Sequence, residues 1–132
     1  MTQRHRPRFR RAALVAWIAY WALLFTSTHV PVPDLPDLPE HSDKVVHFCG
    51  YAVLTLLGAF ATSRGAVRPI RTLLLWSAIF LLYGVLDEWL QRFVNRTPSI
   101  EDFFADAAGI LAGGVAWLIY QRFSPSHART AL

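Results

Sequence analysis

The stretch TLLLWSAIFLLYGVLDEWL, residues 72 to 90, decides the fold class of this chain. From Leu73 to Leu86 it contains no charged residue. A helix needs roughly 20 predominantly apolar residues to cross the hydrocarbon core of a bilayer. The stretch therefore predicts a transmembrane helix with two acidic residues, Asp87 and Glu88, near its end.

The composition of the whole chain is typical of a membrane protein. Of its 132 residues, 54% are hydrophobic and only 17% are charged, whereas a soluble domain carries about 25% charged residues. The mean hydropathy is positive. A chain of this length has room for about four bilayer crossings and none for a separate catalytic domain.

Three further apolar runs lie in the sequence: Ala12 to Ser27, Val45 to Thr62 and Phe103 to Tyr120. With the first stretch they predict an all-α integral membrane bundle, residues 12–122, of four transmembrane helices at about 12–28, 44–63, 71–91 and 101–121. A basic segment, 1–11, precedes it and a tail, 123–132, follows it. The first run also fits a signal peptide. We expect a retained helix, because no A-x-A-like cleavage site follows and the run contains three aromatic residues.

Lysine and arginine are distributed unevenly among the segments outside these runs. Five precede the first run, and the later segments carry one, three, two and two in order. The positive-inside bias then places both termini in the cytoplasm and the loops at 28–44 and 91–102 outside. The net charge of +4 follows this pattern, so we expect no nucleic-acid partner. The single cysteine, Cys49, excludes an intrachain disulfide.

Polar residues collect at the expected outer ends of the helices. Helical spacing of three and four residues places them in one stripe on each helix, and small residues on the fourth helix allow close backbone approach. The set forms the predicted binding site: Asp43, Lys44, His47, Tyr51, Asp87, Glu88, Gln91, Arg96, Ser99, Asp102 and Asp106. Ionisable groups within membrane helices are costly and are read first as a functional site.

Several members of this set also have a plainer structural role. Ser99 and Asp102 form the S-x-x-D pattern of a capping box, and Asp43 can cap the second helix. Lys44 can extend its amine to the membrane interface. Arg96, in the loop between helices three and four, can form a bidentate pair with a carboxylate. A histidine with clustered carboxylates can also hold a divalent metal. No H-x-x-x-H or H-E-x-x-H spacing supports zinc hydrolysis, so we predict neither a metal nor a cofactor and keep the divalent metal as an alternative.

Three blocks of these residues resemble the VanZ-like family of small bacterial membrane proteins. They are D-K-x-x-H-F-x-x-Y from Asp43, D-E-x-x-Q-x-F from Asp87, and R-x-x-S-x-x-D followed by Asp106 and Gly109. Asp106 stands where the family more often has Asn. The resemblance implies a multi-pass protein of the bacterial cytoplasmic membrane, and a link to low-level resistance to the glycopeptide teicoplanin. It carries over no catalytic role, because the biochemical mechanism of the family is not established.

Three functions fit these observations. The first is binding or modification of a cell-envelope group, a lipid head group or a cell-wall precursor, with Lys44, His47 and Arg96 contacting an anion. The second is a membrane enzyme with His47 or Glu88 as an acid or base. The third is an accessory protein whose polar network only braces the helices. The expected partners are membrane lipids and a cell-wall precursor or glycopeptide, and a homo-oligomer stays open.

Overall fold

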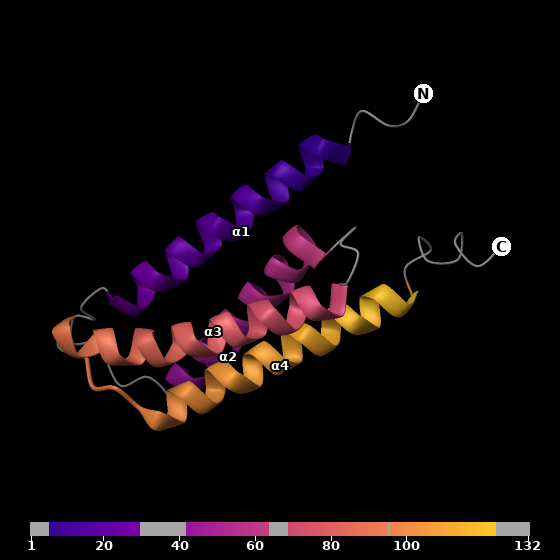
Figure 1. The fold of residues 1–132 in the computed structure, drawn as a ribbon. Coiled ribbons are helices and arrows are strands. Elements are labelled where there is room, and N and C mark those ends of the chain that lie inside the picture. The colour runs from indigo at the N-terminus through magenta and orange to yellow at the C-terminus, as the bar shows by residue number, and fades with distance from the viewer. Residues whose placement is uncertain (1–5, 30–41, 64–68, 95, 124–132) are drawn as a thin grey trace.

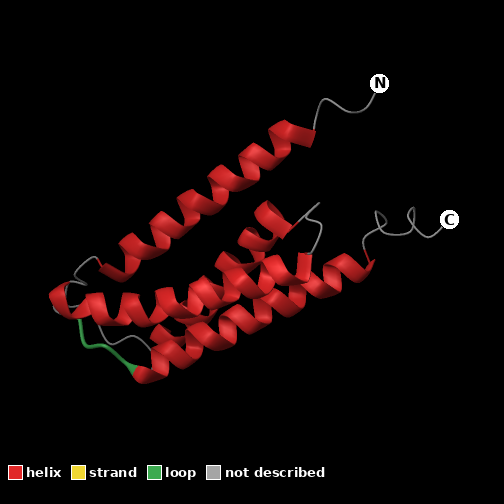
Figure 2. Cartoon of the chain, in the orientation of Figure 1, coloured by secondary structure: helices red, strands yellow, loops and turns green. Residues whose placement is uncertain are grey.

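A computed structural model of the chain describes residues 6–29, 42–63, 69–94 and 96–123. In these ranges the chain is helical apart from the short segment before the last helix, and it contains no strand (Figures 1 and 2). The main helices are α1 (Arg6–His29), α2 (Ser42–Gly58), α3 (Pro69–Gln91) and α4 (Ile100–Phe123). A π-helical turn, Ala59–Ser63, extends α2, and a 3-10 turn, Arg92–Val94, extends α3.

Within the described ranges, four helices are long and apolar enough to cross a membrane, which confirms the predicted all-α chain with four candidate spans. The candidate spans are Arg10–His29, Ser42–Thr62, Pro69–Val94 and Ile100–Phe123. Large apolar side chains lie on the outside of the bundle, as Leu82 does with 73% of its surface exposed. Charged side chains such as Asp87 and Asp106 lie inside, each 1% exposed. This distribution suits a lipid surround, because lipid solvates leucine and not carboxylates.

The first helix begins earlier than the apolar run predicts. α1 starts at Arg6, within the segment expected to be a basic N-terminal extension. An apolar run marks the part of a helix that crosses the bilayer, and arginine continues a helix at little cost. Most of the predicted outer loop at 28–44, namely residues 30–41, lies outside the described residues, as does the tail after residue 123.

The closest helix pair is α2 with α4, and two glycines make the approach possible. A Cβ atom on Gly109 would overlap the carbonyl oxygen of Phe48, and one on Gly113 would overlap that of Ala52. The small residues predicted to permit close packing on this helix therefore do so.

Aromatic side chains join α1 to α3. The Trp17 ring lies 4.7 Å from that of Trp76, and the Trp21 ring lies 5.3 Å from those of both Phe80 and Tyr83, with centroid distances and tilts typical of edge-to-face contacts. The C-terminal ends of α1 and α3 and the N-terminal ends of α2 and α4 lie together at one end of the bundle (Figure 1). The candidate site lies at this end.

Candidate functional site

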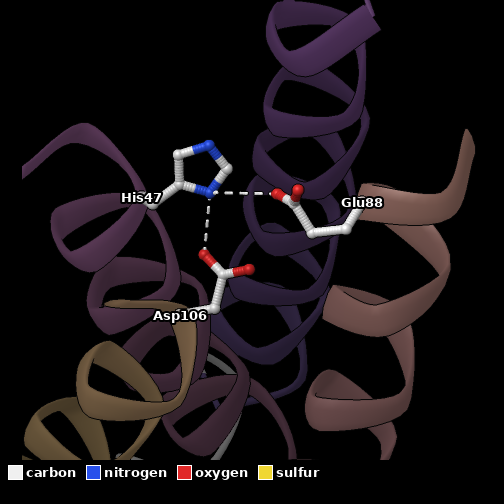
Figure 3. A group of neighbouring side chains, drawn as sticks. All are labelled: His47, Glu88 and Asp106. Atoms are coloured by element: carbon white, nitrogen blue, oxygen red, sulfur yellow. Dashed lines mark hydrogen bonds and ion pairs between the residues drawn. The ribbon is translucent and has the colours of Figure 1, made fainter. Parts of the chain in front are cut away.

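His47, Glu88 and Asp106 meet at the centre of this end of the bundle (Figure 3). His47 lies in the second turn of α2, Glu88 in the last turn of α3 and Asp106 in the second turn of α4. The helices run in alternating directions, so positions near the start of two of them meet a position near the end of the third. All three side chains are buried.

The imidazole lies between the two carboxylates. The His47 Nδ1 atom lies 2.9 Å from Asp106 Oδ1, at hydrogen-bond distance, and 3.9 Å from Glu88 Oε1. One potential ligand atom from each of the three residues lies within 4.8 Å of the others. This triad, as we call the three residues below, combines a nitrogen donor with two oxygen donors.

Glu88 is held in place by neighbours on both of its oxygens. Oε2 accepts the backbone N–H of Ser99 at 2.8 Å, and Oε1 accepts a hydrogen bond from Gln91 Nε2 at 3.2 Å. The Ser99 hydroxyl in turn accepts the backbone N–H groups of Glu101 and Asp102, at 3.2 and 3.4 Å. Ser99 is therefore the N-cap of α4, as its sequence pattern indicated.

One oxygen of Asp106 has no hydrogen-bond partner among the described residues. This atom, Oδ2, is buried, and so is the equally unpartnered hydroxyl of Tyr51 on α2. A Cβ atom on Gly84 of α3 would lie 3.2 Å from Asp106 Oδ2 and 3.6 Å from the Tyr51 hydroxyl. The absence of a side chain at Gly84 therefore lets two polar atoms lie close to the backbone of α3, and each of them is costly to bury unpaired.

Asp87 lies next to Glu88 in sequence but has a different role. Successive helical residues point about 100° apart, and Asp87 turns toward α1. Its Oδ1 accepts hydrogen bonds from the hydroxyls of Thr28 and Tyr83, at 3.1 and 3.2 Å, and its Oδ2 accepts one from Gln91 at 3.3 Å. Both acidic residues are buried.

Lys44 lies at the rim of the site, where carboxylates of α2 and α4 surround it. Its Nζ atom lies 3.0 Å from Glu101, 3.3 Å from Asp43 and 3.8 Å from Asp102. Asp102 Oδ1 is buried and has no hydrogen-bond partner in the described part of the chain. The rim therefore consists of one amine held among three acidic groups.

Arg96 caps a helix, contrary to the expectation that it would pair with a carboxylate. Its Nη1 atom donates to the carbonyl oxygens of Thr28, at 3.0 Å, and Ser27, at 3.4 Å. These carbonyls belong to the last turn of α1, where a helix lacks internal donors and its dipole favours a cation. These side-chain hydrogen bonds of Arg96 thus join the loop before α4 to α1.

Three residues at this end of the bundle were not predicted from the sequence. Thr28 and His29 contact Asp87, the latter with its Nδ1 atom 3.7 Å from Asp87 Oδ1, and Glu101 pairs with Lys44. Thr28 and His29 follow the apolar part of the first run, and their partners come from a helix 59 residues further along the chain. The acidic residue in the first turn of α4 was a usable signal for Glu101, because such residues favour helix N-termini.

No family model, curated protein or solved structure matches the chain.

Proposed function

We propose that this chain is a VanZ-like, multi-pass protein of the bacterial cytoplasmic membrane that binds the polar head group of a cell-envelope lipid or cell-wall precursor. The triad carries the proposal. It is buried at one end of a helical bundle, and the Asp106 Oδ2 atom and the Tyr51 hydroxyl beside it are without partners in the described part of the chain. A network that served only to brace the helices would pair these atoms, because unpaired polar groups destabilise a fold.

The charge distribution supports placing the site at the extracytoplasmic face. Arg10 and Arg11 near the start of α1, Arg71 at the start of α3 and Arg122 at the end of α4 lie at the opposite end of the bundle. Arginine near the ends of membrane helices favours the cytoplasmic side. Both termini are then cytoplasmic in this proposal.

The group that enters the site carries positive charge. The described side chains buried at this end include one imidazole and four carboxyl groups, namely those of Asp87, Glu88, Asp102 and Asp106. Lys44 is bonded to acidic partners and Arg96 to helix carbonyls. Direct contact of an anion with these two cations is therefore less favoured than entry of a cation between the carboxylates.

Lipid retention by the purified chain tests this proposal. We expect native mass spectrometry of the wild type in detergent to show one retained phospholipid, from a mixture of phosphatidylethanolamine and phosphatidylglycerol. The variant Glu88→Gln should lose it. Arg122→Gln, which changes an exposed charged residue near the other end of α4, is the control and should retain it. Equal retention by all three proteins would refute the proposal.

The link to teicoplanin resistance is proposed from the family resemblance alone. It predicts a higher inhibitory concentration of the drug in cells that express the wild type than in cells that express Glu88→Gln at equal membrane abundance. Equal inhibitory concentrations would remove this link and leave the lipid proposal standing.

Stabilisation of the helix bundle is a second candidate function, and the hydrogen bonds of Asp87 favour it. Hydrogen bonds from Thr28, Tyr83 and Gln91 occupy its oxygens. We assign Asp87 this role and keep the triad for binding.

A further inference from the structure

We infer that His47, Glu88 and Asp106 hold a divalent transition-metal ion of the Zn²⁺ or Mn²⁺ class between α2, α3 and α4. This inference rests on the proposed function in one respect, since the metal supplies the positive charge that the site takes. An envelope head group would bind through this ion.

The donor set favours such an ion over Mg²⁺ or Ca²⁺. An imidazole nitrogen with two carboxylate oxygens suits zinc, manganese and iron, whereas magnesium and calcium prefer oxygen ligands alone. Each residue comes from a different helix, so the ligands are positioned by packed elements and not by a loop.

The distances within the triad also favour a metal over an ammonium group. Ligand atoms bound to one ion at about 2.0–2.2 Å lie about 3–3.6 Å apart. Acceptors arranged around one ammonium, each at about 2.9 Å from the nitrogen, lie about 4.7 Å apart. The separations from His47 Nδ1 are 2.9 Å to Asp106 Oδ1 and 3.9 Å to Glu88 Oε1. These two separations are closer to those around a metal, and all three ligand atoms lie within 4.8 Å of one another.

An independent observation is the unpartnered oxygen of Asp106. Oδ2 belongs to a side chain that is 1% exposed, and it points toward the side of Glu88 in Figure 3. It lies close to Gly84 and next to the Tyr51 hydroxyl. A carboxylate with one free oxygen and a neighbouring hydroxyl can complete the surroundings of an ion and orient a water molecule or ligand oxygen bound to it.

Glu88 has the outer contacts that a metal ligand needs. Gln91 donates to Oε1 and the Ser99 N–H donates to Oε2, so the carboxylate cannot swing away from the triad without losing two hydrogen bonds. Outer contacts of this kind fix the orientation of metal ligands.

A metal explains how an acidic site can recognise an anionic head group. Three protein ligands leave at least one coordination position for another donor. A phosphate oxygen of a lipid or of a lipid-linked precursor can occupy that position, because the ion offsets the charge of the two carboxylates. Binding of the ion to His47 Nδ1 displaces any proton from that nitrogen to solvent, so ion uptake releases protons.

Metal titration of the purified full-length chain tests the inference. After treatment with a chelator and its removal, isothermal titration with Zn²⁺ and with Mn²⁺ should show one ion bound per chain. His47→Gln and Asp106→Asn should bind at least roughly tenfold more weakly, and Arg122→Gln, which changes an exposed residue near the other end of α4, should bind as the wild type does. Undiminished binding by His47→Gln, or no saturable binding by the wild type, would overturn the inference.

X-ray absorption of the zinc-loaded wild type removes the dependence on variants that fail to fold. The expected spectrum has a first shell of nitrogen and oxygen atoms and the multiple scattering of one imidazole. A shell without imidazole scattering would place the ion elsewhere and overturn the inference.

Lipid retention with and without chelator separates the two proposals. If the chain binds no metal and lipid retention depends on Glu88 but survives chelation, the metal site is refuted and the proposed function stands. If metal binding depends on His47 but all variants retain lipid equally, the metal site stands and the proposed function is refuted.

Discussion

At the scale of single residues, Glu88 performs a task that the sequence pattern assigns to Asp102. In a capping box the acidic residue three positions after Ser99 accepts the N–H of the cap. Here Glu88 of α3 accepts it, and Asp102 Oδ1 is left facing the Lys44 amine at 3.8 Å. One carboxylate thus both positions the start of α4 and faces His47, which couples the local structure of the loop to the site.

Replacement of Thr28 measures how much the hydrogen bonds to Asp87 stabilise the helix bundle. Thr28→Val removes a hydroxyl that lies 3.1 Å from Asp87 Oδ1 and 3.0 Å from the carbonyl oxygen of Phe25 on its own helix, and we expect it to lower the free energy of unfolding in mixed micelles by about 1 kcal/mol. Thr26→Val is the matched control, because the hydrogen bond described for the Thr26 hydroxyl is to the carbonyl of Ala22 on the same helix. Equal losses for the two variants would show that Asp87 does not hold α1 to the bundle.

Replacement of Tyr51 distinguishes a role in ligand binding from a role in stabilising the helix bundle. Its hydroxyl has no partner among the described residues, so Tyr51→Phe should leave the free energy of unfolding without ligand unchanged or higher. Retention of lipid and of metal should fall. Tyr83→Phe, which loses a hydrogen bond to Asp87, should instead lower stability by about 1 kcal/mol. A loss of stability in Tyr51→Phe with unchanged binding would assign Tyr51 to the brace.

At the scale of helices, glycines on α4 determine how near α2 can come. Gly109→Ala and Gly113→Ala each place a methyl group against backbone of α2, and we expect each to cost about 1–3 kcal/mol by forcing the helices apart. Gly114→Ala is the control, since its Cβ would meet Leu73 at an ordinary 3.8 Å. Thermal unfolding of the three variants in one detergent compares them, and an equally stable Gly109→Ala would contradict this account of the packing.

The helices could be predicted from sequence more completely than the contacts between them. The run from residue 72 to 90 predicted α3, because a bilayer crossing requires continuous apolar residues. Spacing along each helix brought His47, Glu88 and Asp106 to one end. The cap that Arg96 provides for α1 was not predictable in this way. Its partners are backbone carbonyls 68 and 69 residues earlier in the chain, and their positions depend on packing that no local pattern records.

The π-helical turn at the end of α2 is a second element without a local signal. Ala59–Ser63 follows Gly58, and a Cβ atom on Gly58 would lie 2.9 Å from Trp17 Nε1. The fit of Gly58 against Trp17 depends on α1, which again lies far away in sequence. Packing between helices that are distant in sequence was thus the part of the fold that hydrophobic periodicity could not predict.

At the scale of the whole molecule, the orientation in the membrane decides which compartment the site faces. Thr97, an exposed residue beside the start of α4, reports on the site end, and Arg122, an exposed residue near the end of α4, reports on the other. In a background of Cys49→Ala, which removes the single natural cysteine, we expect a membrane-impermeant maleimide to label Thr97→Cys in intact protoplasts. Arg122→Cys should be labelled only after permeabilisation, because arginine near helix ends favours the cytoplasm. The opposite pattern would place the triad at the cytoplasmic face, where it could not receive an envelope head group from outside.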